Sequence, residues 1–323
     1  MLKTHSTAAP ALEPATQAFV DGLAGGKPIP SLSLADARAV LVAAASSPDV
    51  TPPDAQIKDV TLPVGPLGQT DIRVVRPNGA TGVLPVIIYV HGGGWVLGDR
   101  NTHDRLIREL AIGAEAALVF VDYQRSPEAR FPVAIEQAYA VAKYVADNAA
   151  KLNVDAQRMV IAGDSVGGNM ATAVALLAKE RKGPHFIAQT LFYPVTDASM
   201  STASYEEFAE GPWLTMASMA WFWDQYLPEA EKRGDRHASP LQASLDELKG
   251  LPPTLLIVDE NDVLRDEGEQ YARKLAEAGV RVTAVRYNGT IHDFMMLNPL
   301  AKTPAVRGAI GQTIGYLRHA FSA

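Results

Sequence analysis

The sequence predicts an α/β protein with an eight-stranded, mostly parallel sheet, flanked by helices and covered by a helical cap. Three observations predict this class. Short apolar runs alternate with helical patterns over most of the chain, which is typical of parallel strands joined by crossover helices. A hairpin pattern precedes the alternation, which favours an antiparallel start. A segment of almost sixty residues, which includes a helical stretch, interrupts the alternation late in the chain, which favours a cap.

The N-terminal part predicts helices and then a hairpin. Residues 1–50 are rich in alanine and contain scattered prolines, and helices are expected at 14–25 and 34–47. Alternating apolar residues at 57–64 and 70–77, joined by GPLGQ, predict an antiparallel pair of strands.

The remaining elements alternate. Strands are predicted at 84–90, 116–123, 158–163, 189–195, 253–259 and 281–287. Helices are predicted at 101–114, 131–152, 167–183, 267–279 and 304–321. The interrupting segment is helical and carries three of the four tryptophans. We therefore expect cap helices at 1–50, a domain built on the sheet at 51–195 and 246–323, and a cap insertion at 196–245.

Composition excludes several classes of function. The 323 residues are 47% hydrophobic and 20% charged, as in globular proteins, and the net charge of −7 with no basic run predicts no nucleic-acid partner. The chain has no cysteine, so disulfides, thiolate metal sites and cysteine nucleophiles are excluded. No signal peptide and no apolar stretch of about 20 residues is present, which predicts a cytoplasmic protein without a membrane partner.

The first chemical motif is Gly163-Asp164-Ser165-Val166-Gly167, between a predicted strand and a predicted helix. A nucleophilic serine requires this setting, because a strained turn lifts its hydroxyl clear of the sheet. The flanking glycines are expected because a β-carbon there would collide with neighbouring backbone. A glycine-rich helix start without catalytic function is the alternative.

The second motif is His91-Gly92-Gly93-Gly94, directly after the buried strand 84–90. Successive glycines allow backbone N–H groups to approach a tetrahedral oxyanion. A phosphate-binding loop is the alternative, but neither G-K-[ST] nor the G-x-G-x-x-G spacing is present. The glycine run together with Ser165 therefore favours an oxyanion hole.

A serine nucleophile needs a base, and His292 is the expected one among seven histidines. It lies in the loop after the last predicted strand, where a side chain can reach the carboxyl edge of the sheet. His185 precedes a strand, His237 lies in the insertion and His319 lies near the end of the terminal helix.

The carboxylate partner is expected after the strand 253–259. The candidates there are Asp259, Glu260, Asp262, Asp266 and Glu267. Periodicity does not choose among them. Asp262 is preferred because it lies in the loop between the strand end and the first helical turn.

These motifs together resemble the bacterial branch of the hormone-sensitive lipase family of α/β-hydrolase esterases. The matching stretches are HGGGW at 91–95, VDYQRSPEARFPVAIEQAY at 121–139, GDSVGGN at 163–169, DVLRDEG at 262–268 and IHDF at 291–294. The Gly-Asp-Ser start is similar to the GDSAG type of serine motif. The resemblance covers the chain from about Ile57 to the C-terminus.

The resemblance implies site residues and a reaction. It implies Ser165 as nucleophile, Asp262 as carboxylate and His292 as base, with oxyanion donors on the backbone of Gly93, Gly94 and Val166. His91 would brace the loop. The family usually has Asp-Pro-Leu and His-Gly-Phe where this chain has Asp262-Val263-Leu264 and His292-Asp293-Phe294. Asp293 is expected to raise the pKa of the base.

We expect hydrolysis of short- to medium-chain carboxylic esters through an acyl-enzyme, without metal or cofactor. The expected substrate-binding residues are Trp95, Phe208, Trp213, Met216 and Phe222, although each could instead pack the cap. A lactonase or amidase on the same triad is the main alternative. A lyase or a small-molecule receptor is less favoured, because Ser165 and His292 are both present. The expected partner is a small ester, and a homodimer is compatible with the sequence.

Overall fold

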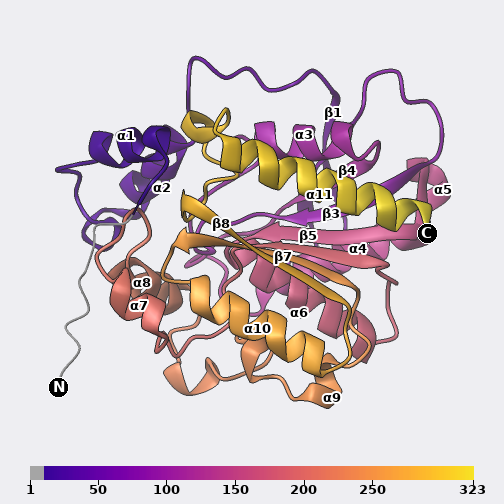
Figure 1. Ribbon diagram of the computed structural model, residues 1–323. Coiled ribbons are helices and arrows are strands. Elements are labelled where there is room, and N and C mark those ends of the chain that lie inside the picture. Colours follow the sequence, from indigo (N-terminus) through magenta and orange to yellow (C-terminus); the bar gives the residue numbers. More distant parts are fainter. Residues whose placement is uncertain (1–10) are drawn as a thin grey trace.

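The computed structural model describes residues 11–323, which form one eight-stranded sheet with helices on both faces (Figure 1). The strands are β1 Gln56–Leu62, β2 Thr70–Arg76, β3 Leu84–Val90, β4 Ala117–Asp122, β5 Val154–Asp164, β6 Ala188–Phe192, β7 Thr254–Asn261 and β8 Val282–Ile291. Their order is β1-β2-β4-β3-β5-β6-β7-β8. The strand β2 is antiparallel to both its neighbours, β1 and β4, and the other neighbouring strands are parallel to each other. The predicted fold, with an antiparallel start and a mostly parallel sheet, is confirmed.

Helices cover the two faces of the sheet. On one face lie α3 (Asp104–Gly113) and α11 (Pro304–Ser322), and on the other lie α4 (Val133–Asp147), α6 (Val166–Glu180) and α10 (Arg265–Glu277) (Figure 1). The central strands are consequently buried on both sides: Val86 through Val90 of β3 have no exposed surface. This double cover is the reason why the central strands are nearly continuous apolar runs. Within residues 11–323, no helix has the length and apolarity needed to cross a membrane.

The register of the parallel strands gathers the predicted motifs at one edge. Val90 of β3 lies opposite Gly163 of β5, so the loop starting at His91 and the turn at Ser165 leave the sheet side by side. Asn261 of β7 lies opposite Ile291 of β8, so the segments that follow those strands are also neighbours. Ligands of open α/β sheets bind at this carboxyl edge.

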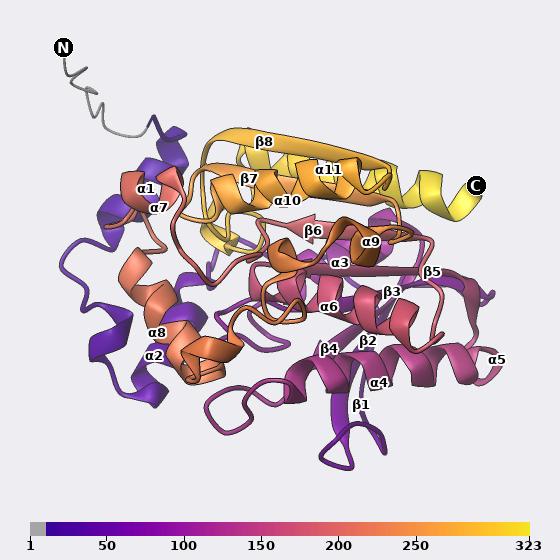
Figure 2. The same ribbon diagram turned by 90° about the horizontal axis from the view of Figure 1, so that it is seen from below.

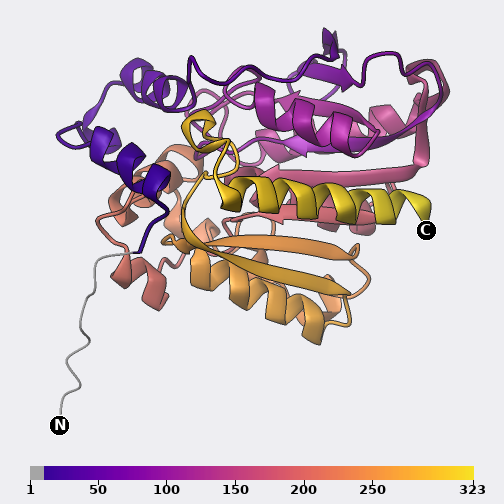
Figure 3. The same cartoon turned by 45° about the horizontal axis from the view of Figure 1, so that its top comes forward.

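A group of helices lies beyond this carboxyl edge. It contains α1 (Pro14–Gly22) and α2 (Leu34–Ala44) from the N-terminal region, and α7 (Ala203–Glu207) and α8 (Met216–Tyr226) from the segment between β6 and β7 (Figures 2 and 3). The two parts touch, since the rings of Phe19 and Trp213 meet edge to face at 5.6 Å between centroids. The two segments are distant in sequence but adjacent in space.

Several element boundaries differ from the sequence expectation. The helix expected over 131–152 is divided at Asn148 into α4 and the short α5 (Ala149–Leu152). The helical stretch between β6 and β7 is likewise interrupted between α7 and α8, and the short α9 (Leu245–Leu248) follows later. The strand β8 continues to Ile291, beyond the expected end at 287, because an irregularity in β7 allows pairing to resume at Asn261.

Candidate active site

Ser165 occupies a strained turn between β5 and α6. Its backbone has φ 54° and ψ −122°, outside the regions that non-glycine residues ordinarily adopt, at a cost of about 1–3 kcal/mol. The flanking glycines make the turn sterically feasible. A β-carbon on Gly163 would lie 2.3 Å from the Gly167 carbonyl oxygen, and one on Gly167 would lie 2.0 Å from the Val90 carbonyl oxygen. The expected collisions with backbone are therefore present.

The structure brings Ser165, His292 and Asp262 into one hydrogen-bonded chain. His292 Nε2 lies 2.9 Å from Ser165 Oγ, and His292 Nδ1 lies 2.7 Å from Asp262 Oδ2. The other oxygen of Asp262 accepts the Leu264 N–H at 3.0 Å, which fixes the carboxylate plane. All three side chains are buried. The order nucleophile, base and orienting carboxylate is the geometry of a serine hydrolase.

The other candidate carboxylates have different partners. Glu260 accepts the Gly289 N–H at 2.7 Å, and Asp266 accepts the Ser204 N–H at 2.9 Å. Glu267 is fully buried and accepts the backbone N–H groups of Thr196 and Asp197. Each of these residues thus holds a loop, and none of them contacts His292 through a hydrogen bond among residues 11–323.

Asp259 is a buried carboxyl group beside the chain of three. It has no exposed surface, and neither oxygen has a hydrogen-bond partner among the described residues. Burial, followed by the nearby charge of Asp262, raises the pKa of Asp259 far above its ordinary value. Donor atoms of Asp259, Asp262 and His292 lie within 4.8 Å of one another, a spacing that a cation could use. The atoms Asp262 Oδ2 and His292 Nδ1 are, however, already joined to each other.

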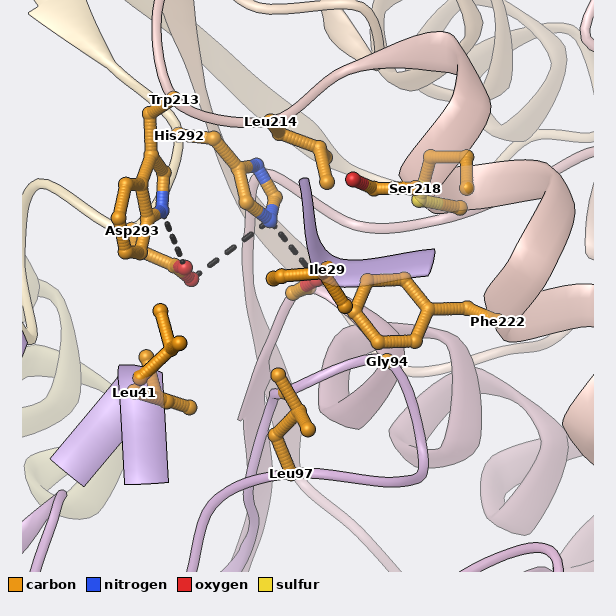
Figure 4. Close-up of a pocket in the computed structure, with 14 residues that line it drawn as sticks. Ile29, Leu41, Gly94, Leu97, Trp213, Leu214, Ser218, Phe222, His292 and Asp293 are labelled. Atoms are coloured by element: carbon orange, nitrogen blue, oxygen red, sulfur yellow. Dashed lines mark hydrogen bonds and ion pairs between the residues drawn. The ribbon is translucent and has the colours of Figure 1, made fainter. Parts of the chain in front are cut away.

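Asp293 places a second carboxylate next to the base. One of its oxygens lies 3.6 Å from His292 Nε2, and the other accepts the Trp213 indole N–H at 2.9 Å (Figure 4). Burial alone would lower the pKa of His292, but the charges of Asp262 and Asp293 outweigh it and raise that pKa to about 9. The direction agrees with the expectation from the sequence.

The backbone N–H groups expected to form the oxyanion hole have no hydrogen-bond acceptor among the described residues. Gly93 and Gly94 have positive φ angles of 103° and 62°, so glycine is needed at both positions. No acceptor within residues 11–323 bonds the N–H groups of Gly93, Gly94 or Val166. Val166 is also the first residue of α6, where the helix dipole adds partial positive charge. These amides can therefore stabilise a developing oxyanion.

An apolar pocket opens onto Ser165 and His292 (Figure 4). It has a volume of about 40 Å³. Its lining combines both cap segments with the glycine loop: Ile29, Val40, Leu41, Gly93, Gly94, Leu97, Trp213, Leu214, Ser218, Met219, Phe222 and Asp293. The ring of Phe222 packs against Gly94, where a β-carbon would lie 2.2 Å from it.

Three of the five expected pocket residues lie elsewhere, which corrects that expectation. Trp95 is fully buried and stacks on Tyr226 at 4.1 Å, so it joins the cap to the sheet domain. Phe208 packs beneath the Arg265 guanidinium at 5.2 Å. Met216, at the start of α8, is 38% exposed. Only Trp213 and Phe222 of this set line the pocket among the described residues.

Sequence reasoning missed a polar cluster behind Ser165. Asp164 accepts hydrogen bonds from Tyr89 and Gly92, and it pairs with His103, which lies just before α3. Asp164 stands in the Gly-Asp-Ser motif and His103 in the stretch NTHD. Their pairing, however, depends on tertiary packing, which the sequence does not show. His91, expected to brace the loop, lies beside this cluster and stacks on Tyr123 at 4.2 Å.

The fold and the arrangement around Ser165 define a class of protein. The family model described as α/β hydrolase fold matches residues 87–296, a span that contains Ser165, Asp262 and His292. The chain belongs to this α/β-hydrolase family.

Individual relatives are esterases. The chain is 36% identical to carboxylesterase NlhH of Mycobacterium tuberculosis over 273 residues, covering 84% of this chain and 85% of that protein. It is 34% identical to an ethyl acetate hydrolase of Pseudomonas putida over 268 residues, covering 82% of each chain. A solved structure of a thermostable esterase from Pseudomonas putida superposes with a TM-score of 0.94 at 51% identity, covering 97% of this chain and 99% of that one.

Proposed function

We propose that this protein is a serine carboxylesterase that hydrolyses short- to medium-chain carboxylic esters through an acyl-enzyme on Ser165. The observation that carries the proposal is the hydrogen-bonded chain from Ser165 through His292 to Asp262, which faces an apolar pocket beside three available amides. The esterase names of relatives that align over more than four fifths of the chain support it.

The reaction has two halves. His292 Nε2 takes the Ser165 proton while Oγ attacks the ester carbonyl carbon, and Asp262 holds Nδ1 protonated. The carbonyl oxygen becomes an oxyanion that accepts hydrogen bonds from the amides of Gly93, Gly94 and Val166. The C–O bond then breaks, and His292 returns the proton to the leaving alcohol. Water, deprotonated by His292, attacks the acyl-enzyme and releases the acid and free Ser165.

The pocket supports a preference for short acyl groups. Its cavity volume of about 40 Å³ is small, which favours a short acyl group. The relative named as an ethyl acetate hydrolase is consistent with a small acyl group. We expect turnover of p-nitrophenyl esters to fall steeply from butyrate to palmitate, and Met219→Ala to shift the optimum toward longer chains.

The decisive experiment is p-nitrophenyl butyrate hydrolysis by the wild type and by Ser165→Ala, Asp262→Asn and His292→Ala. Ser165→Ala and His292→Ala should each lose on the order of 10⁶-fold in kcat, and Asp262→Asn on the order of 10⁴-fold. An organophosphate probe should label the wild type at Ser165 and leave Ser165→Ala unlabelled. The control is His185→Ala, an exposed histidine whose loss should not change kcat. Full activity in Asp262→Asn would show that another carboxylate orients the base.

Finer assignments follow from the same motifs. We place the chain in the bacterial branch of the hormone-sensitive lipase family because its serine motif begins Gly163-Asp164-Ser165. A division into cap segments at 1–50 and 196–245 with a catalytic domain at 51–195 and 246–323 is part of the proposal, although residues 1–10 lie outside the described part of the chain. A cytoplasmic location and a homodimer are also part of the proposal. Sedimentation of the purified protein would test the oligomeric state.

A further inference from the structure

A buried polar cluster connects the nucleophile turn to the glycine loop. Asp164 directly precedes Ser165 and has no exposed surface. Its Oδ1 accepts the Tyr89 hydroxyl at 2.7 Å and the Gly92 N–H at 3.1 Å, and its Oδ2 lies 3.1 Å from His103 Nε2. One carboxylate is therefore next in sequence to Ser165 and is bonded to the glycine that precedes Gly93 and Gly94.

The hydrogen bonds around His103 determine which of its ring nitrogens carry protons. The hydroxyl of Thr102 has one proton, which it donates to the Asp99 carbonyl at 2.9 Å. The same oxygen lies 2.9 Å from His103 Nδ1, so it accepts there and Nδ1 carries a proton. His103 Nε2 faces the Asp164 carboxylate, which two other donors keep ionised, so Nε2 also carries a proton. His103 is an imidazolium by this count.

The surroundings of His103 leave Asp164 as its counter-charge. The side chain of His103 is buried, and its ring lies 5.5 Å from His91, 6.0 Å from Phe120 and 6.4 Å from Tyr89. Burial lowers the pKa of His91 to about 3, so His91 is neutral. Burial also opposes protonation of His103, but the charge of Asp164, and more weakly that of Asp293, raises its pKa above the ordinary value.

We propose that His103 is a positioning residue that stays protonated, cancels the charge of Asp164 behind the oxyanion hole and locks the glycine loop against the Ser165 turn. The inference rests on the proposed esterase function. Without the imidazolium, the negative charge of Asp164 would have no counter-charge. Asp164 lies two residues before Val166 and accepts the N–H of Gly92, the residue before Gly93. That charge would disfavour the negative oxyanion of the transition state. Stabilisation of this oxyanion supplies much of the rate enhancement in such sites.

The kinetic test uses His103→Gln, Asp164→Asn and the double variant. His103→Gln keeps a donor for Asp164 but removes the positive charge, and we expect kcat to fall on the order of 10- to 100-fold with KM nearly unchanged. The double variant removes both charges and should recover at least tenfold over His103→Gln. A double variant no better than His103→Gln would overturn the electrostatic role. His237→Gln, which loses a surface histidine paired with Glu180 and Asp235, is the matched control and should match the wild type.

A second measurement does not depend on catalysis or on a folded variant. In wild-type protein with ¹⁵N-labelled histidine, both His103 ring nitrogens should show the shifts of protonated nitrogen from pH 6 to pH 8. A neutral imidazole with one unprotonated nitrogen at pH 7 would overturn the proposal. An inactive wild type with a doubly protonated His103 would instead remove the esterase assignment and leave the ion pair standing.

Discussion

At the scale of single residues, His292 carries the clearest consequence for pH. Its pKa of about 9 results from Asp262 and Asp293, which outweigh the opposing effect of burial. Attack by Ser165 requires the neutral imidazole, so a base with this pKa is mostly protonated at neutral pH. We expect kcat/KM for p-nitrophenyl butyrate to rise with pH up to about 9, after correction for spontaneous hydrolysis.

The substitution Asp293→Asn tests the source of this shift. It removes the charge 3.6 Å from Nε2, so the rise of kcat/KM should move to lower pH. Protonation of His292 also makes the free energy of unfolding depend on pH. The folded pKa is above the unfolded value of about 6.5, so this histidine stabilises the fold fully below pH 6.5, and the contribution is lost as pH rises through about 9. An unmoved pH profile in Asp293→Asn would leave Asp262 as the dominant charge.

At the scale of elements, α3 holds the segment that follows His292. Arg105 of α3 is buried and donates to the Met295 carbonyl at 2.5 Å and to Asn298 Oδ1 at 2.7 Å. It also pairs with Glu109 one turn later at 3.1 Å. A planar guanidinium can satisfy these acceptors together, whereas a lysine ammonium cannot match the geometry.

We expect Arg105→Met to lower the free energy of unfolding by about 3 kcal/mol, because it leaves buried acceptors without a donor. It should also reduce kcat by loosening the loop after His292. Urea unfolding and p-nitrophenyl butyrate kinetics measure the two effects. Arg307→Met is the control, since Arg307 contacts the same Glu109 from an exposed position and should cost less than about 1 kcal/mol. Equal losses of unfolding free energy in both variants would argue against a special role of the buried Arg105 contacts.

The terminal helix α11 offers the opposite kind of substitution. Gly311 and Gly315 are exposed, and a β-carbon at either position would meet nothing within 4 Å. Alanine is favoured over glycine in a helix interior by about 1 kcal/mol. Gly311→Ala and Gly315→Ala should each raise the free energy of unfolding by nearly that amount without changing kcat. Gly308→Ala should gain less, because its β-carbon would lie 3.3 Å from the Tyr287 ring. Urea denaturation of the three variants compares them directly.

At the scale of the whole molecule, the cap and the sheet domain form the pocket together, and Arg38 is one link between them. From α2, it donates to the Val96 carbonyl at 3.0 Å and to the Ser126 carbonyl at 3.2 Å. It also forms a two-pronged pair with Glu128. The same helix supplies Val40 and Leu41 to the pocket lining, so this anchor positions pocket-lining residues.

We expect Arg38→Ala to raise KM roughly three- to tenfold with little change in kcat, because the lining shifts while the triad does not. Limited proteolysis should also cut the N-terminal region faster. Arg158→Ala removes an ion pair confined to β5 and should leave both readouts unchanged. An unaltered KM in Arg38→Ala would mean that the other cap contacts suffice to hold α2.

The sequence by itself determined the fold class and the chain order of the reactive groups. Short apolar runs and period-3.6 patterns are local properties, so alternating strands and helices can be read directly from the sequence. The parallel strands then direct Ser165, Asp262 and His292 to one edge. The tertiary structure alone decided which aromatic side chains face the pocket and that Asp164 pairs with His103. Those outcomes depend on how α2, α3 and α8 pack against distant loops. Trp95 and Phe222 are both aromatic residues that end up buried, and only packing decides that Phe222 lines the pocket and Trp95 does not.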